Sequence, residues 1–310
     1  MTTTGCITHD DCLLHASDRP HPECPARLEA VHAALRSHAG LHRADAPLGT
    51  DEQLRLAHHP QHVEQLLALE AGGAAQIDAD TYFGADSLRA ARRAAGGALL
   101  AVDRVLDGTW ENAFVAARPP GHHAERGRAM GFCLANSIAI AAAHARAARG
   151  LQRVFAFDWD VHHGNGTQEI FYGDGNVFYA SLHESPLFPH SGRTSERGEG
   201  DGARATLNLP QPAGATGADW LRAFDESVLP AMRAHRPELI LISAGFDAHA
   251  EDPLANTLLA TADFAQLTGR VLDAAAELCG GRVVSVLEGG YHLGALAESV
   301  AAHVQALQGE

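Results

Sequence analysis

Acidic and imidazole side chains follow an apolar run in the segment 153-RVFAFDWDVHHGNGTQEIF-171. Asp160 and His162 are two residues apart, so on an extended chain their side chains point to the same side. A charge at the end of a buried strand is unfavourable unless a partner or a metal ion compensates for it. We therefore predict that Asp160 and His162 are half of a metal site, and that Asp158 faces away and supports a histidine from a neighbouring strand end.

A third metal ligand is expected in 243-SAGFDAH-249, where Asp247 follows another apolar run. Three protein ligands with one open position are typical of catalytic zinc. One imidazole and two carboxylates also suit Fe²⁺ or Co²⁺. A lone aspartate after a strand more often caps a helix or a turn. The prediction of one catalytic zinc per chain therefore depends on the three residues together.

Two consecutive histidines, His122 and His123, occupy the proline- and glycine-containing segment 118-RPPGHHAE-125. Hydrolysis of an amide needs a base that takes a proton from water and an acid that protonates the leaving amine. The candidate partners of the two imidazoles are Asp158 for one and Asn165 for the other. The sequence leaves open which histidine is the base, because a coupled pair titrates as a unit. A pair of surface histidines is the alternative interpretation.

Tyr291 follows two glycines in 287-LEGGYH-292. Glycines let the backbone turn sharply and approach a site closely. A phenol at such a place can donate a hydrogen bond to a developing oxyanion. An ordinary turn explains the same three residues when they are considered alone.

Apolar runs alternate with helical stretches along the whole chain, which predicts an α/β fold with an open, mostly parallel sheet and helices on both faces. The expected strands are 113–117, 153–159, 176–182, 238–244 and 282–288, and the expected helices are 26–38, 86–106, 135–149, 219–235 and 263–278. Each polar, glycine-containing cluster follows one of these strands, so we expect the clusters to meet at the carboxyl edge of the sheet, where ligands of such folds bind. Residues 1–310 are expected to form a single domain.

Composition excludes several classes of protein. A formal net charge of −15 argues against direct binding of nucleic acid or of an anionic membrane. The chain contains no lysine, so Schiff-base and pyridoxal phosphate chemistry are excluded, and it has no GxSxG, P-loop or HExxH motif. Five scattered cysteines and the lack of a visible signal or transmembrane segment favour a cytoplasmic location.

Taken together, these motifs resemble those of the histone deacetylase superfamily, which has the arginase–deacetylase fold, and in particular its class II-like bacterial amidohydrolases. The matching segments are 21-HPECPAR-27, 118-RPPGHHAE-125, 131-GFCLANSIAIAA-142, 156-AFDWDVHHGNGTQEIFY-172, 178-FYASLHE-184, 243-SAGFDAHAEDPL-254 and 287-LEGGYH-292. The resemblance implies a zinc-dependent hydrolase of acetyl-lysine with Asp160, His162 and Asp247 as ligands. It also implies that Asp158 lies behind His122 and Asn165 behind His123, and that Tyr291 polarises the substrate carbonyl.

The same resemblance implies the parts that bind the substrate and structural cations. Phe132 and Phe188 are then the two walls of the acyl-lysine tunnel, the Gly131 carbonyl meets the substrate amide, and Asp80 at the rim grips the substrate backbone. A structural potassium ion would use Asp158, Ser181 and carbonyls of Asp160, His162 and Leu182. A second potassium ion would use carbonyls near Phe171, Asp174 and Val177. His163 has no expected role beyond packing.

The expected partner is an acetylated lysine in a peptide or protein, and a small acetylated amine such as an acetylpolyamine is the alternative. Leu254 favours lysine, since acetylpolyamine enzymes of the family can carry a glutamate at this gate position. A binuclear ureohydrolase on the related fold and a binding module without hydrolysis are the other hypotheses. The sequence leaves open the acyl-chain preference, the native metal and the oligomeric state.

Overall fold

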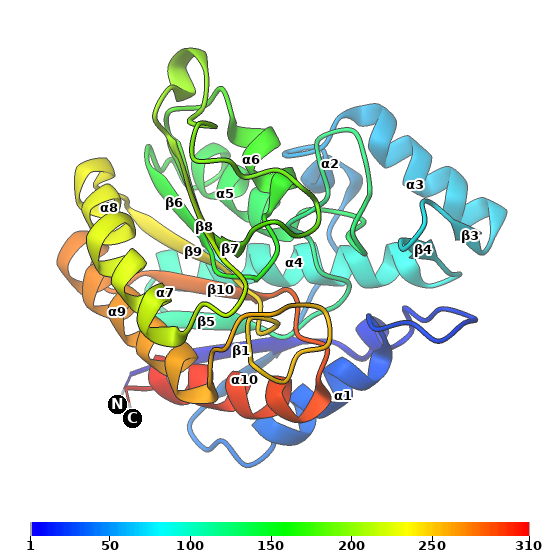
Figure 1. Cartoon of the computed structure of the whole chain (residues 1–310). Coiled ribbons are helices and arrows are strands. Elements are labelled where there is room, and N and C mark those ends of the chain that lie inside the picture. Colours follow the sequence, from blue (N-terminus) through cyan, green and yellow to red (C-terminus); the bar gives the residue numbers. More distant parts are fainter. Residues whose placement is uncertain (1, 310) are drawn as a thin grey trace.

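The central element of the computed structural model, which describes residues 2–309, is an eight-stranded sheet (Figure 1). Its spatial order is β2-β1-β5-β10-β9-β6-β7-β8, and every neighbouring pair in it is parallel. The strands are β1 (Thr4–Thr8), β2 (His42–Asp45), β5 (Asn112–Val115), β6 (Val154–Asp158), β7 (Val177–Glu184), β8 (Thr206–Gln211), β9 (Leu239–Ala244) and β10 (Val283–Leu287). The predicted α/β class with a parallel sheet is therefore confirmed.

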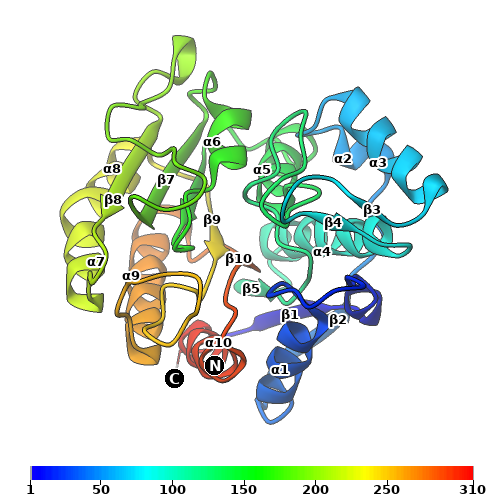
Figure 2. The same ribbon diagram turned by 45° about the vertical axis from the view of Figure 1, so that its right-hand side comes forward.

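Helices cover both faces of this sheet (Figures 1 and 2). Helices α4 and α5 pack together on one face, whereas α1, α10 and α9 form a continuous layer on the other. The α-helices are α1 (Pro25–Leu35), α2 (Asp51–Leu54), α3 (Pro60–Gly72), α4 (Ser87–Leu106), α5 (Ser137–Ala147), α6 (Asn165–Phe171), α7 (Gly217–Ala223), α8 (Leu229–His235), α9 (Thr261–Cys279) and α10 (Leu293–Leu307). A short antiparallel ribbon, β3 (Ala75–Gln76) and β4 (Tyr82–Phe83), lies outside the main sheet. Among residues 2–309, no helix has the length and apolarity needed to cross a membrane.

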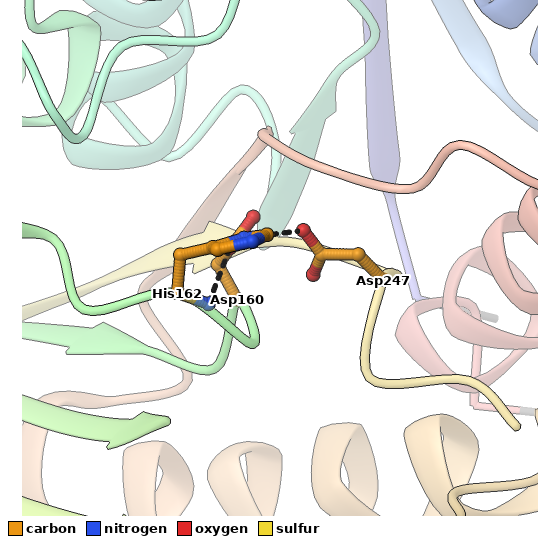
Figure 3. A group of neighbouring side chains, drawn as sticks. All are labelled: Asp160, His162 and Asp247. Atoms are coloured by element: carbon orange, nitrogen blue, oxygen red, sulfur yellow. Dashed lines mark hydrogen bonds and ion pairs between the residues drawn. The ribbon is translucent and has the colours of Figure 1, made fainter. Parts of the chain in front are cut away.

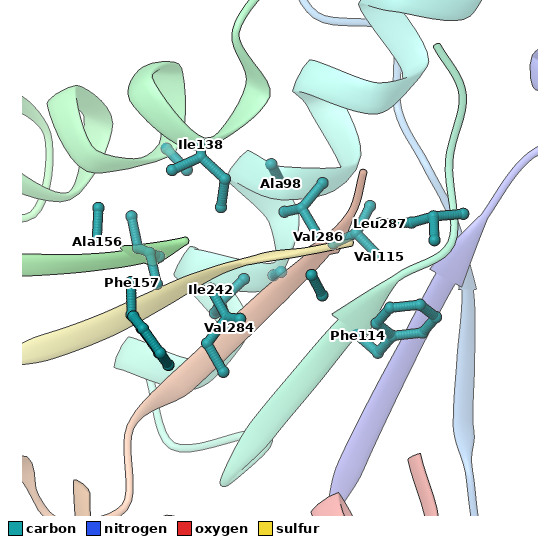
Figure 4. Packing of buried hydrophobic residues seen from close by; sticks show 14 of the residues in the cluster. Ala98, Phe114, Val115, Ile138, Ala156, Phe157, Ile242, Val284, Val286 and Leu287 are labelled. Carbon is teal, nitrogen blue, oxygen red and sulfur yellow. The ribbon is translucent and has the colours of Figure 1, made fainter. Parts of the chain in front are cut away.

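The hydrophobic core lies between the sheet and both helix layers. The five strands predicted from apolar runs are the central ones, and the side chains of β5, β6, β9 and β10 are buried on both faces (Figure 4). Burial on both faces explains why these strands are continuous apolar runs rather than alternating patterns. Strands β1, β2 and β8 were not expected. Strands β2 and β8 lie at the edges of the sheet and contain partly exposed, polar residues. Strand β1 has the sequence TGCIT, which is not a continuous apolar run.

The predicted helix over 219–235 is interrupted. Between α7 and α8, residues Phe224–Val228 form a π-helical segment. Pro230, the second residue of α8, lacks an N–H, and its ring crowds the carbonyl four residues before it. The wider helical turn before Pro230 therefore replaces the regular turn that the continuous pattern predicted.

Buried charges anchor the beginning of the loop that carries the tandem histidines. Arg118 Nε and Nη2 donate to Glu23 Oε1 and Oε2 at 2.5 and 2.6 Å, and both side chains are fully buried. Arg27 Nη1 donates to the same carboxylate at 3.1 Å. Burial alone would raise the pKa of Glu23, but Arg118, with His15 and Arg27, lowers it to about 2.

Removing Arg118 is expected to destabilise the fold. In Arg118→Ala, the buried Glu23 carboxylate loses its two-point partner, and breaking such a pair from one side costs about 3–5 kcal/mol of the free energy of unfolding. Urea unfolding followed by circular dichroism measures the loss. Arg89→Ala, which removes an exposed ion pair with Asp86, is the control, with an expected loss below about 1 kcal/mol. Equal losses in the two variants would contradict a structural role for the Glu23–Arg118 pair.

Candidate functional site

Four loops meet at the carboxyl edge of the sheet, because β5, β10, β9 and β6 are consecutive in space (Figure 2). The predicted site residues follow these strands: His122 and His123 after β5, Asp160 and His162 after β6, Asp247 after β9 and Tyr291 after β10. Parallel pairing places the four carboxyl ends at one edge, so residues far apart in the sequence come together there. The expected convergence of the polar clusters is thus present.

Asp160, His162 and Asp247 form one compact group of potential metal ligands (Figure 3). One ligand atom from each residue lies within 4.8 Å of the others, and all three residues are buried. His162 Nδ1 lies 3.1 Å from Asp160 Oδ1 and 3.1 Å from Asp247 Oδ2. A tetrahedral zinc site separates its ligand atoms by about 3.3–3.6 Å, which follows from metal–ligand distances of about 2.0–2.2 Å. The donor types and their spacing therefore fit a zinc ion.

The electrostatics of this group also favour a cation. Burial and the neighbouring Asp160 carboxylate raise the pKa of Asp247 to about 7. Burial opposes a charge on His162, but its contacts with Asp160 and Asp247 outweigh burial and raise its pKa to about 10. Without a metal, the two carboxylates therefore hold a proton on His162. A divalent ion bound by the three residues would supply that positive charge and would leave His162 neutral, as a ligand must be.

Two carboxylate oxygens of this group lie directly against the backbone of Gly289. The Gly289 N–H donates to Asp160 Oδ2 at 2.7 Å. A Cβ at position 289 would lie 2.0 Å from Asp247 Oδ2 and 2.5 Å from Asp160 Oδ2, so no larger residue fits. In the segment LEGGYH, the first glycine therefore allows the β10 loop to contact both predicted ligands.

Asp158 supports His122, as expected. His122 Nδ1 donates to Asp158 Oδ2 at 3.0 Å, and the same oxygen accepts a hydrogen bond from Tyr179 Oη at 3.1 Å. Strand alternation does not explain why Asp158 and Asp160 have different contacts, because residues two apart on a strand share a face. Strand β6 ends at Asp158, and the bend that follows separates Asp158 from the metal-ligand group.

The two neighbouring imidazoles differ in their protonation. Burial disfavours a charge on His122, but the Asp160 and Asp158 carboxylates outweigh burial and hold its pKa well above the ordinary value. Burial, together with the positive charges of His122 and His162, holds the pKa of His123 well below the ordinary value. His123 Nδ1 lies 2.9 Å from Asn165 Oδ1, a neutral acceptor. The surroundings therefore favour the charged form of His122 and the neutral form of His123.

Glu288, at the end of β10, is a buried site residue that the sequence analysis did not identify. Its Oε2 accepts hydrogen bonds from the backbone N–H groups of Gly121 and His122, at 2.6 and 3.1 Å. Burial raises its pKa to about 7. Glu288 thus holds the histidine loop against β10. An acidic residue directly after the apolar strand VVSVL was the signal that could have identified it.

A narrow cavity of about 220 Å³ leads to these groups. Its lining consists of Asp80, His123, Gly131, Phe132, His162, Leu187, Phe188, Leu254 and Tyr291. All five residues predicted to contact the substrate are in this set, and Leu187 is an addition that the sequence analysis missed. The volume is below the roughly 300–1,000 Å³ that is typical of drug-sized ligand sites. A cavity of this size suits a ligand that enters as a narrow, extended side chain.

The backbone at Phe132 is strained. Its φ is +68°, a left-handed conformation that is uncommon for residues other than glycine. The Phe132 N–H donates to Thr81 Oγ1 at 3.1 Å, and its ring lies edge-on to that of Tyr291, with 5.7 Å between centroids. Phe188 lies edge-on to His123, at 5.1 Å. The strained residue thus forms one wall of the cavity, and Phe188 lies beside His123.

Tyr291 is held from two sides. The guanidinium carbon of Arg27 lies 4.7 Å from the centroid of its ring. Asp252 Oδ2 accepts a hydrogen bond from the Tyr291 N–H at 2.6 Å, and Asp252 Oδ1 accepts one from the Leu254 N–H at 3.0 Å. Burial holds the pKa of the Tyr291 phenol well above its ordinary value, so the hydroxyl keeps its proton and can donate it in a hydrogen bond.

Of the residues expected to bind potassium, Asp158 contacts the site through His122. Asp158 and Ser181 are direct neighbours in the β6–β7 register, and Leu182 follows in β7. Phe171 ends α6, Val177 begins β7, and Asp174 lies in the short connection between them, where its carboxylate pairs with Arg146. The structure thus brings Asp158 and Ser181 together, and cation binding stays a prediction for both groups.

His163 is buried and has packing contacts, as expected. Its Nδ1 lies 2.8 Å from Ser191 Oγ, and its Nε2 lies 3.0 Å from Gln168 Oε1. Ser191 lies in the loop that follows β7 and carries Phe188. His163 therefore joins the metal-ligand segment to the loop that forms one wall of the cavity.

The chain is similar to known proteins over most of its length. Residues 21–307 match the family model described as histone deacetylase domain. The chain is 41% identical over 272 residues to the histone deacetylase-like amidohydrolase of Pseudomonas aeruginosa, covering 87% of this chain and 71% of that protein. It is 40% identical over 327 residues to human polyamine deacetylase HDAC10, covering 99% of this chain and 48% of that protein. The crystal structure of the HDA15 HD domain superposes with a TM-score of 0.95 at 36% identity, covering 100% of this chain and 89% of that one.

Proposed function

The chain belongs to the histone deacetylase family, and from this membership and the geometry of the site we propose that it is a zinc-dependent hydrolase that removes acetyl groups from the side-chain amine of lysine. The observation that carries the proposal is the grouping of Asp160, His162 and Asp247 beside the tandem histidines at a narrow cavity. The three buried donors would hold the zinc ion. When bound, zinc supplies Lewis acidity that polarises a carbonyl and makes water more acidic.

The residues of the chain itself supply the proton transfers. His123 lines the cavity, and its Nδ1 faces the neutral Asn165 amide, so its Nε2 can take the proton of the attacking water. His122 contacts the Asp158 carboxylate, which favours its protonated form, and a positive charge there would stabilise the negative charge that develops in the transition state. The protonated His123 then returns a proton to the leaving amine. Asn165 and Asp158 keep the two rings in place.

Tyr291 acts on the substrate carbonyl. Tyr291 lines the cavity, and burial favours its protonated form, so its hydroxyl can donate a hydrogen bond to the oxygen that becomes negative. Phe132 and Phe188 would enclose the methylene groups of the lysine chain, which burial of apolar surface stabilises. The Gly131 carbonyl would accept from the amide N–H, and Asp80 at the rim would contact the peptide backbone.

The second candidate is deacetylation of a small acetylated amine such as an acetylpolyamine. The net charge of −15 and the similarity to a polyamine deacetylase favour it. Leu254, which lines the cavity, favours the lysine side chain, because it offers no charge to a second ammonium group. The deciding experiment compares kcat/KM for acetyl-lysine peptides, acetylpolyamines and longer acyl-lysines on one preparation. Failure of all three classes to release an acid would contradict the proposal.

A charge at the gate is expected to change the substrate preference. Leu254→Glu should raise kcat/KM for an acetylpolyamine relative to an acetyl-lysine peptide by about fivefold, since an exposed ion pair contributes up to about 1 kcal/mol. Leu254→Gln, of similar size without the charge, is the matched control and should not change the ratio. The ratio of the two kcat/KM values measures the effect, which should weaken at high salt. An equal change in both variants would assign the effect to shape.

Several further properties belong to the same proposal. They are a single catalytic domain over residues 1–310, structural potassium ions at the two groups of residues described above, a cytoplasmic location, and no direct nucleic acid or membrane partner.

A further inference from the structure

One contact of the Asn165 amide is not used in the mechanism above. Its Oδ1 faces His123 Nδ1 at 2.9 Å, whereas its Nδ2 lies 2.8 Å from Oε1 of Glu125. The same nitrogen also approaches the His123 carbonyl oxygen and the Met130 sulfur, at 3.4 and 3.3 Å. The side chains of His123, Asn165 and Glu125 thus form a chain of two hydrogen bonds that leads from the cavity to a partly buried carboxylate.

The short contact of Asn165 Nδ2 with the Glu125 carboxylate favours one orientation of the amide, and the longer contact with the His123 carbonyl oxygen acts in the same direction. An amide can be turned so that its oxygen and nitrogen exchange places. In the exchanged orientation Asn165 Oδ1 would face Glu125 Oε1, and two acceptors would oppose each other. With Glu125 present, the amide oxygen therefore faces His123. Since that oxygen can only accept, His123 Nδ1 must carry a hydrogen, which leaves the lone pair on Nε2.

Tight backbone packing holds Glu125 against Asn165. The first turn of α6 lies directly on the histidine loop, and a Cβ at Gly166 would come within 2.2 Å of the Ala124 carbonyl oxygen. The Thr167 N–H donates to the His122 carbonyl oxygen at 3.2 Å. On the other side of the loop, the Glu125 carbonyl oxygen lies 2.9 Å from His58 Nδ1. The backbone at Glu125 is therefore fixed by packing, and the hydrogen bond to Asn165 Nδ2 places its side chain.

We propose that Glu125 is a positioning residue, which acts through the Asn165 amide to hold His123 in the tautomer that has its lone pair on Nε2. The inference rests on the proposed function, because it assigns His123 as the group that takes a proton from water. Glu125 does not line the cavity, so it is not expected to contact the substrate. Its contribution should appear in kcat rather than in KM.

The kinetic test compares variants at positions 125 and 165 on an acetyl-lysine peptide. Glu125→Ala should lower kcat about tenfold with little change in KM, since one orienting hydrogen bond is lost. Glu125→Gln keeps an acceptor for the Asn165 amide and should stay within about threefold of wild type. Asn165→Ala removes the link, so adding Glu125→Ala to it should lower kcat no further. Independent, multiplicative losses in the double variant would overturn the proposal.

The sharpest test is whether Glu125→Gln has opposite effects on kcat in two different backgrounds. In Asn165→Asp, the new carboxylate would lie beside that of Glu125, and the two negative charges would repel each other. Adding Glu125→Gln to Asn165→Asp should therefore raise kcat several-fold, although the same change does not improve wild type. If Glu125→Gln lowers kcat in both backgrounds, the proposal is wrong. Glu169→Ala is the matched control, because its exposed carboxylate accepts from the Arg126 N–H and does not contact Asn165.

A spectroscopic measurement separates this inference from the proposed function. The ¹⁵N chemical shifts of labelled histidine report which ring nitrogen carries hydrogen, and the His123 signal is identified by its loss in His123→Ala. Wild type should show hydrogen on Nδ1, and Glu125→Ala should show a mixture of tautomers. An unchanged His123 signal in Glu125→Ala would overturn the inference even if the enzyme is an active deacetylase. A wild-type protein without turnover would overturn the proposed function. The ¹⁵N signal of His123 in wild type and in Glu125→Ala would still test the role of Glu125 in that case.

Discussion

Tyr291→Phe should lower kcat by about 100- to 1,000-fold, because it removes one donor from the oxygen that becomes negative in the transition state. The phenol lines the cavity, and burial keeps it protonated, so the wild-type residue donates at neutral pH. The ring contacts with Arg27 and Phe132 do not need the hydroxyl, so the variant should fold normally. KM should change little, since the interaction strengthens only in the transition state.

Steady-state kinetics with an acetyl-lysine peptide measures this effect, and the metal content of each preparation is measured in parallel. Tyr172→Phe removes a hydroxyl that does not line the cavity, and this control should keep the wild-type kcat. The Tyr291→Phe protein should also bind as much zinc as wild type. A kcat unchanged in Tyr291→Phe would exclude Tyr291 as the group that stabilises the oxyanion.

Removal of the metal is expected to abolish hydrolysis, and one equivalent of zinc per chain should restore it. The free energy of unfolding should rise with added zinc, because an ion that binds only the folded state stabilises it by about 4 kcal/mol at a thousandfold excess over Kd. Asp247→Ala removes one of three ligands and should weaken zinc binding by more than about 100-fold. Mutation of a residue that only hydrogen-bonds to a metal ligand typically weakens binding by about 10- to 100-fold. It should not, however, disturb the strands that end at the site.

Chelation, zinc titration and thermal unfolding are the measurements for this prediction. Asp273→Ala, which changes an exposed carboxylate on α9, is the matched control and should bind zinc normally. Two metal ions per chain would favour the binuclear ureohydrolase hypothesis instead. Full activity of the metal-free protein would contradict metal-dependent hydrolysis altogether. Hydrolysis that depends on zinc would also exclude the binding-module hypothesis.

The sequence by itself determined the fold class and the position of the site. The central strands β5, β6, β9 and β10 are buried on both faces, so each is a continuous apolar run that can be recognised locally. The polar segments that follow these runs had to lie at the carboxyl edge of a parallel sheet. Residue type and spacing then predicted Asp160, His162 and Asp247 as one group, which the structure brings together.

Only the tertiary structure decided the order of the strands and the partners of the site residues. The hydrogen bond from the Gly121 N–H to Glu288 joins residues 167 positions apart, and that between Asn165 and Glu125 joins residues 40 positions apart. Such contacts arise from the packing of whole elements, so no local pattern encodes them. The edge strands β2 and β8, and β1 beside β2, likewise depend on what packs against them. The same holds for the π-helical segment before Pro230 and for the left-handed Phe132. Residue type thus fixed the available chemistry, and packing over long sequence distances decided which group each residue contacts.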